Sequence, residues 1–376
     1  MKKISMFVNV DWFFLSHRLE IAKESAKRNF EMTVYADFTT NHNEHAYGEF
    51  SFLQSPIRRK SNSIISLFMD FFKTYLVLKN DKPDAIHAVT IKPIIFLGII
   101  CLITRIPFIA SVSGLGPAFS DTGVFNKIRR RFVMFIYKLI FAPKSTRIIC
   151  QSKHDADTLL DNGILSRDKL FMTEGSGVNI PDYKYPQFIE SDTLNVLMAS
   201  RLLRDKGVLE FCLAAAKINR MKNIETKFSL AGPIDINSPG AFTEEQVIEM
   251  CESNNVEFLG NRSDLPLILS QAHIFVLPSY YAEGLPKVLL EAAASSCAVI
   301  TTDHPGCRDA ILHGKTGLAI KPKDVSSLVS GLEQLLSNLD LIKSMGRAGR
   351  ELAVERFSVD IVIDVHYSLY NELLKE

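Results

Sequence analysis

The chain has 376 residues, of which 47% are hydrophobic and 23% are charged. This length exceeds what one ordinary hydrophobic core covers, so two domains are expected, and the composition excludes a disordered or fibrous chain. A formal net charge of +1 also excludes the broad positive field of a general nucleic-acid binder.

Short apolar runs alternate with helical patterns through the first half of the chain. The expected strands are residues 4–10, 31–36, 85–89, 108–112 and 147–151, and the helices between them include 16–28, 64–79, 93–103 and 126–141. Alternation of this kind predicts a parallel sheet that is covered by helices on both faces.

A proline-bearing polar stretch at residues 179–186 interrupts this pattern and predicts a linker. An amphipathic helix at about 359–374 is expected to end the chain. The strands expected between them are 194–199, 227–230, 256–259, 274–277 and 299–302. The sequence thus predicts an α/β protein with two Rossmann-like domains whose parallel sheets face a central cleft. We expect the first domain at 1–180, joined by the last helix at about 357–376, and the second at 181–356.

The sequence shows no pattern of export or membrane insertion. Residues 1–10 run through a short apolar stretch into Asp11 without the cleavage site of a signal peptide. The longest uncharged apolar run, 93–103, has about half of the ~20 residues that a spanning helix needs. The six cysteines are scattered without a C-x-x-C pair, which argues against disulfides and a metal site. These features predict a cytoplasmic protein.

Ligands of open parallel sheets bind beyond the carboxyl ends of the strands, so loops after the strands of the second domain are the expected site. Arg201 follows the strand 194–199, and Lys206 and Gly207 open the next helix. Two cations at a helix N-terminus can bind a diphosphate, because backbone N–H groups and the helix dipole add to their charge. Taken alone, such a pair is more often solvated surface.

Two further loops of the second domain carry polar residues. Asn261 and Arg262 follow a glycine, where a turn can present backbone groups to a nucleobase or can simply cap the next helix. Glu283 precedes a glycine at the start of the helix that carries Glu291. Because just over two helical turns separate these glutamates, both carboxylates can point to one side. Two unrelated surface glutamates are the alternative.

In combination, Arg201, Lys206, Glu283, Glu291 and the segment 278–286 resemble the donor-binding signature of retaining GT-B glycosyltransferases, in particular glycosyltransferase family 4. The resemblance covers essentially the whole chain. It implies the GT-B fold and a hexosyl- or N-acetylhexosaminyltransferase that retains anomeric configuration by same-face displacement.

The resemblance also implies three catalytic residues. Arg201 and Lys206 would hold the donor diphosphate and stabilise the leaving group, so that no divalent metal and no cofactor would be required. Glu283 would contact hydroxyls of the transferred sugar.

The remaining donor contacts are implied in the same way. Glu291 would hydrogen-bond the ribose hydroxyls. Backbone N–H groups of Gly284 and Leu285 would assist at the transferred sugar. The turn at Asn261 and Arg262 would receive the base.

The first half is similar to a narrower group, the bacterial enzymes that extend sugars on undecaprenyl diphosphate in surface-polysaccharide and glycan biosynthesis. The similar segments are residues 11–18, 86–93, 113–116 and 175–179. This similarity implies a UDP-sugar as donor and an undecaprenyl-diphosphate-linked saccharide as acceptor.

Two departures from the family concern the acceptor side. Many relatives have a Gly-Gly loop where this chain has 11–18, and a histidine where it has Ser113. A capping or packing role is the alternative for His17, and His87, inside an apolar strand, is expected in the core. We expect acceptor contacts from five residues: His17, Lys92, Ser113, Gly114 and Gly116.

Two segments of the first half pair basic residues with an apolar helix. Residues 58–60 precede the apolar run 64–72. Such segments can lie in an anionic membrane interface, where each basic residue adds about 1 kcal/mol, or can pack in the core with a solvated basic end. A membrane role places the protein peripherally at the inner face of the plasma membrane. The second segment is residues 126–138. In it, the residues expected to associate with the membrane are Arg129, Arg130, Arg131 and Phe132.

The sequence therefore predicts transfer of a hexose or N-acetylhexosamine from a UDP-sugar to a polyprenyl-diphosphate-linked saccharide, with retention. Two alternatives stay open. A GT-B epimerase or hydrolase of nucleotide sugars would convert the UDP-sugar alone. A non-catalytic partner protein would bind the nucleotide sugar without turnover.

Overall fold

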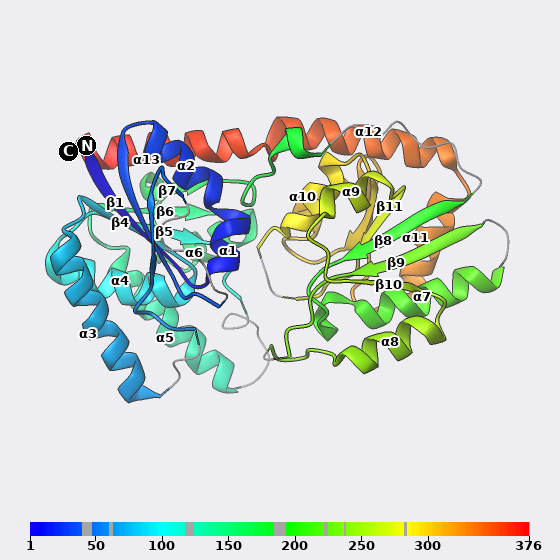
Figure 1. The fold of residues 1–376 in the computed structure, drawn as a ribbon, viewed down its shortest axis with the longest axis horizontal. Helices are drawn as coiled ribbons and strands as arrows, with labels where there is room; N and C mark the ends of the chain where they lie inside the picture. The colour runs from blue at the N-terminus through cyan, green and yellow to red at the C-terminus, as the bar shows by residue number, and fades with distance from the viewer. Residues whose placement is uncertain are drawn as a thin grey trace. The chain divides into compact units, whose positions relative to one another are not determined.

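The computed structural model describes residues 1–39, 47–59, 63–116, 124–183, 193–221, 225–236, 238–281 and 284–375, without the side chains of 124–126. The chain forms two compact units, one of Met1–Gly177 with Val359–Glu376 and one of Val178–Ser358 (Figure 1). Each unit contains a parallel sheet flanked by helices, which confirms the predicted α/β class with two Rossmann-like halves.

The sheet of the first unit has the order β3-β2-β1-β4-β5-β6-β7. Its central strands are short and almost fully buried, as expected for strands that helices cover on both faces. The strands are β1 (Lys2–Val8), β2 (Phe30–Ala36), β3 (Ser51–Gln54), β4 (Ala85–Val89), β5 (Phe108–Val112), β6 (Thr146–Cys150) and β7 (Leu170–Met172).

Helices of the first unit connect successive strands, and the last helix of the chain returns to this unit. Tyr370 of this last helix is fully buried and packs edge-on against Phe30, with ring centroids 5.6 Å apart. The helices are α1 (Asp11–His17), α2 (Leu19–Lys27), α3 (Ile64–Asp81), α4 (Ile91–Thr104), α5 (Val124–Ile140), α6 (Lys153–Asp161) and α13 (Val359–Lys375).

The predicted helix 16–28 is present as α2 but begins later, because α1 and α2 meet at Arg18. This residue leaves the helical conformation, with φ −134° and ψ −9°, and its side chain is buried. Its guanidinium donates to the carbonyl of His17 at 2.8 Å and to Ser113 Oγ at 3.1 Å. A long-range contact therefore decides where the first helix ends, and the local pattern does not contain it.

The sheet of the second unit has the order β10-β9-β8-β11-β12-β13. Its strands are β8 (Leu194–Ala199), β9 (Thr226–Ala231), β10 (Glu257–Gly260), β11 (Ile274–Leu277), β12 (Ala298–Thr302) and β13 (Gly317–Ile320). Its helices are α7 (Val208–Met221), α8 (Glu244–Ser253), α9 (Leu265–Ser270), α10 (Lys287–Ala294), α11 (Val325–Leu336) and α12 (Leu339–Arg356).

Three strands, β3, β7 and β13, were not predicted. All three lie at a sheet edge and have only three or four residues. A run this short carries too little apolar periodicity to be distinguished from a loop.

Candidate functional site

Lys206 is the buried cation of the candidate site in the second unit, with only 6% of its surface exposed. It ends a 3-10 turn, Arg204–Lys206, that leads into α7. Gly207 follows with φ +82°, and a Cβ on it would lie 2.4 Å from the carbonyl oxygen of Pro278. Only glycine therefore lets this turn approach the loop after β11 so closely.

Arg201 and Lys206 face the same aromatic ring. The centre of the Tyr281 ring lies 5.8 Å from Arg201 Cζ and 5.1 Å from Lys206 Nζ. The turn and the loop are joined by a backbone hydrogen bond, since the carbonyl of Asp205 accepts from the N–H of Tyr280 at 2.9 Å. A cation within about 6 Å of an aromatic face is attracted by the ring quadrupole. The structure thus brings the two predicted cations together after the ends of β8 and β11.

Glu291 lies on α10 and is almost fully buried, with 7% of its surface exposed. Its Oε1 is 3.3 Å from Lys287 Nζ, one turn earlier on the helix. Burial raises the pKa of Tyr183, and the neighbouring Glu291 carboxylate raises it further. Arg350 of α12 donates to the carbonyl of Tyr183 at 2.5 Å and also to the carbonyl of Ala294 at the end of α10. These contacts hold α10 and its glutamate in one position.

Glu283, the predicted companion of Glu291, lies outside the residues that the structure describes. Gly284 after it is buried, and Leu285 packs against the core of the second unit. The backbone at 284 and 285 is thus part of the same loop that leads from Tyr281 into α10.

A pocket of ≈ 170 Å³ opens where β8 and β9 end. Gly232 closes one wall, with φ +148° and a position for Cβ only 1.7 Å from the carbonyl oxygen of Ser200. Asn261 and Arg262, predicted to receive a base, both line this pocket, and Arg262 pairs with Asp264 through two bonds of 2.7 and 2.5 Å. The further lining residues are Ala199, Ala231, Pro233, Leu265 and Val288.

The sequence marks Gly207 only as a residue that opens a helix and Tyr281 only as part of the segment 278–286, and it gives no sign of the role of Gly232. Tyr281 adjoins another tyrosine, and no local signal shows which ring faces the cations. The two glycines matter because the backbone of a distant strand end lies against them. The sequence feature that could have indicated these glycines is their position after predicted strands, where ligands of parallel sheets bind.

In the first unit, Ser113 follows β5 and meets Arg18 after α1. Arg18 Nη2 donates to Ser113 Oγ at 3.1 Å. Gly114 and Gly116 both have positive φ, +125° and +62°, so the chain turns sharply after Ser113. His17 instead stacks its ring on Phe13, with centroids 4.2 Å apart and planes 5° from parallel.

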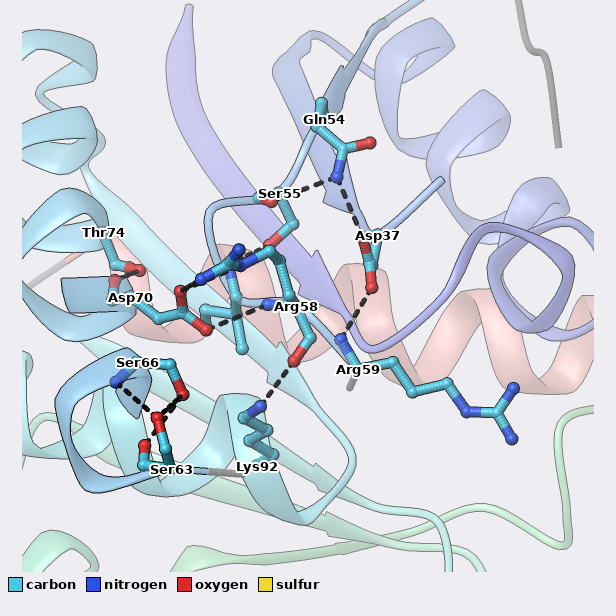
Figure 2. A network of polar contacts seen from close by, with 11 residues as sticks. Asp37, Gln54, Ser55, Arg58, Arg59, Ser63, Ser66, Asp70, Thr74 and Lys92 are labelled. Carbon is cyan, nitrogen blue, oxygen red and sulfur yellow. Dashed lines mark hydrogen bonds and ion pairs between the residues drawn. The ribbon is translucent and has the colours of Figure 1, made fainter. Parts of the chain in front are cut away.

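Lys92, another predicted acceptor residue, holds the segment between β3 and α3. Its Nζ donates to the carbonyl of Arg58, and burial lowers the pKa of Lys92 (Figure 2). The side chain of Arg58 reaches the buried Asp70 at 3.1 Å, and Asp37 accepts from the backbone N–H of Arg59 at 2.6 Å. The ammonium group of Lys92 therefore links the segment between β3 and α3 to α4.

His87 lies in the core, as the sequence predicts. It is fully buried in β4, and its ring nitrogens lie 2.7 Å from the Tyr370 hydroxyl and 2.7 Å from Ser111 Oγ. Burial lowers its pKa well below the usual histidine value, so it is neutral in the folded protein.

The apolar stripe of α5 is exposed and does not pack into the core. Phe132 and Phe135 are 62% and 60% exposed, whereas Val133 and Tyr137 form the buried face of the helix. Arg129 and Arg131 flank the stripe and are exposed, and Arg130 is half-buried. Helix α3 repeats this pattern with exposed Ile64, Ile65, Phe68, Met69 and Phe72.

No group of three or more His, Cys, Asp or Glu residues in the described ranges could hold a metal ion. Within the same ranges, every helix is too short or too polar to cross a bilayer.

Solved structures share this two-sheet architecture. A sucrose-phosphate synthase from Thermosynechococcus elongatus matches 100% of both chains with a TM-score of 0.80 at 18% identity. An Anabaena protein solved with UDP and glucose matches 98% of both chains with a TM-score of 0.74 at 16% identity. The fold is GT-B, the class of the glycosyltransferases among these neighbours.

Sequence comparison identifies the family. Residues 180–352 match the glycosyl transferases group 1, and residues 3–152 match the glycosyl transferase 4-like family. The chain is 30% identical, over 84% of each chain, to the N,N'-diacetylbacillosaminyl-diphospho-undecaprenol alpha-1,3-N-acetylgalactosaminyltransferase of Campylobacter jejuni. It is 23% identical to the UDP-Gal:alpha-D-GlcNAc-diphosphoundecaprenol alpha-1,3-galactosyltransferase of Escherichia coli, over 85% of this chain and 83% of that one. The chain therefore belongs to the group 1 glycosyltransferases.

Proposed function

We propose that this glycosyltransferase moves a hexose or N-acetylhexosamine from a UDP-sugar to a polyprenyl-diphosphate-linked saccharide, with retention of configuration. The observation that carries the proposal is the convergence of Arg201 and Lys206 on the Tyr281 ring after the strand ends of the second unit. The names of the Campylobacter jejuni and Escherichia coli relatives support the acceptor class, and the second name supports the donor class.

The chemistry of transfer rests on these two cations. When the bond from the sugar to the nucleoside diphosphate breaks, negative charge develops on the departing phosphate oxygen. A guanidinium and an ammonium already in place stabilise that charge without reorganising, and this supports catalysis without a divalent metal. The departing phosphate then accepts the proton of the acceptor hydroxyl, which attacks from the face that the diphosphate leaves. Glu283 would contact hydroxyls of the transferred sugar.

The nucleoside would occupy the neighbouring strand ends. Glu291 has the buried, fixed carboxylate that can accept hydrogen bonds from both ribose hydroxyls. The pocket beside Asn261 and Arg262 would take the uracil ring. Each of these contacts orients the donor for attack, and orientation contributes several kcal/mol to the rate of a two-substrate reaction.

The exposed faces of α3 and α5 would bring the enzyme to its lipid-linked acceptor. Both helices belong to the first unit and present aromatic and aliphatic side chains to solvent beside basic residues. An exposed apolar patch of this kind marks an interaction surface, and its basic rim favours anionic lipid headgroups. We therefore propose peripheral association with the inner face of the plasma membrane.

A substrate panel tests the function. UDP-activated hexoses and N-acetylhexosamines would be incubated with short-chain polyprenyl-diphosphate saccharides, and products read by mass and by the anomeric coupling in NMR. A new α-linkage from an α-linked donor supports the proposal. Conversion of UDP-sugar without acceptor would instead favour an epimerase or hydrolase, and donor binding without turnover would favour a non-catalytic role.

A further inference from the structure

Arg18 is a buried cation at the strand ends of the first unit. Only 1% of its surface is exposed, and burial lowers its pKa to about 10. Among the residues that the structure describes, no aspartate or glutamate forms an ion pair with it. Buried charges in proteins are normally paired, because removing an ion from water is costly. A guanidinium kept here without an acid therefore calls for an explanation.

All the hydrogen-bond partners of Arg18 are neutral. The guanidinium donates to the carbonyl of His17 at 2.8 Å and to Ser113 Oγ at 3.1 Å. With its amide oxygen toward the guanidinium, Gln151 at the end of β6 accepts from Nη1 at 3.1 Å and from Nη2 at 2.6 Å. The Nε atom of Arg18 is buried and bonds to no described residue. These contacts fix the charge in place but leave it uncompensated.

Ser113 lies between the buried Arg18 guanidinium and the surface after the end of β5. Its Oγ accepts from Arg18, so its own hydrogen points elsewhere, and no described residue accepts that hydrogen. The residue is half-buried and opens the turn that runs to Gly116. Asp155, the carboxylate nearest along this turn, is occupied, since it accepts from the backbone N–H of Leu115 at 3.3 Å and from Ser152 at 2.7 Å. A hydroxyl that accepts from a cation is a stronger donor to a negative oxygen.

We propose that Arg18 is a positioning residue, whose buried charge fixes and polarises the Ser113 hydroxyl as a donor to an oxyanion of a bound diphosphate. The inference rests on the proposed function and adds to it a group of the first unit, the Ser113 hydroxyl, that would donate to the negatively charged diphosphate. That diphosphate belongs either to the lipid-linked acceptor or to the nucleotide donor, and the two sources have separate tests.

The decisive variants change Gln151, which contacts Arg18 without facing the ligand itself. Gln151→Glu is nearly isosteric and places a carboxylate on the guanidinium, so it neutralises the charge and completes a buried ion pair. Gln151→Met has a similar volume and removes both hydrogen bonds but leaves the charge. We expect Gln151→Glu to raise or keep Tm and to weaken diphosphate binding at least tenfold. Gln151→Met should lower Tm and change binding less than threefold.

Binding is measured by calorimetry with two probes. Farnesyl diphosphate is titrated in the presence of saturating UDP and reports the acceptor, and UDP alone reports the donor. A loss in Gln151→Glu confined to one probe assigns the oxyanion to that substrate. Binding that follows Tm, with Gln151→Met weaker than Gln151→Glu, would show that Arg18 only supports the fold. The inference is also overturned if Gln151→Glu binds each probe as tightly as wild type does.

A double-mutant cycle tests the step through Ser113. If Arg18 acts through this hydroxyl, Ser113→Ala weakens binding of the affected probe in wild type but has little further effect in Gln151→Glu. Additive losses would contradict the relay. Neither measurement needs sugar transfer, so an enzyme that proves inactive on polyprenyl-diphosphate acceptors would refute the proposed function and leave this test intact.

Discussion

The ammonium group of Lys206 lies 5.1 Å above the Tyr281 ring, and the guanidinium of Arg201 approaches the same ring at 5.8 Å. Two like charges held near one aromatic ring repel each other. The attraction of each cation to the ring offsets part of this repulsion. The ring thus helps to hold two positive charges close together, and the proposed function assigns a diphosphate to them.

Replacing Lys206 with alanine should lower kcat by roughly 100-fold or more, because a preorganised charge on the leaving group is lost. The nearby Arg204 is exposed and lies over Phe242, 4.9 Å from its ring centre. Arg204→Ala is therefore the matched control and should change kcat less than threefold. Initial rates at saturating donor measure both. An unchanged kcat in a folded Lys206→Ala protein removes Lys206 from the leaving-group role.

Changing Glu291 to glutamine should weaken UDP binding by about tenfold, since a charged acceptor of ribose hydrogen bonds becomes a neutral one. The same change should nearly abolish the preference for UDP over 2'-deoxy-UDP. Titration calorimetry with both nucleotides checks this. Glu333→Gln on α11, at an exposed position, serves as control. A preference for the ribose 2'-hydroxyl that survives in Glu291→Gln contradicts the assignment.

Reversing the charge of Arg129 and Arg131 should weaken binding to anionic liposomes by about tenfold or more, because each basic residue near the surface contributes about 1 kcal/mol. The control reverses Lys217 and Arg220, two exposed cations of α7 in the second unit. Flotation with vesicles of phosphatidylglycerol and phosphatidylcholine measures both double variants. If both pairs lose binding equally, net charge explains the effect and α5 has no special part in it.

Stability should fall as the pH drops below about 6.5, because two buried histidines are neutral in the folded state. Burial lowers the pKa of His366 to about 3 and that of His87 well below its usual value. The unfolded chain takes up protons on both as the pH falls through the ordinary histidine range, while the folded chain does not. Each then contributes a loss of roughly 1 kcal/mol of unfolding free energy per pH unit.

Urea unfolding at pH 7, 6 and 5 measures this dependence. His366→Asn should have a shallower slope than wild type by about one proton. His154→Asn, which changes an exposed histidine of α6, should keep the wild-type slope. Equal slopes in wild type and His366→Asn would falsify the assignment of the proton uptake to the buried site.

Much of the fold could be predicted because its signals are local. The strands 85–89, 108–112, 194–199 and 274–277 match their predicted limits, since each is a largely buried run bounded by polar residues or proline. Part of the candidate site in the second unit was equally accessible, because Arg201, Lys206 and Asn261 follow predicted strands. The helix break at Arg18 was not, since the contact that causes it joins residues 95 positions apart.

The sequence by itself determined the α/β class with its two halves, the family and the positions of Arg201, Lys206 and Glu291, because apolar periodicity and motif spacing are properties of short segments. The tertiary structure alone decided which side chains are buried and what compensates their charge. It exposes the apolar stripe of α5, leaves Arg18 in the interior with no acid paired to it among the described residues, and makes Gly207 and Gly232 indispensable. Burial and electrostatic compensation depend on atoms that distant parts of the chain bring together, and no local pattern contains them.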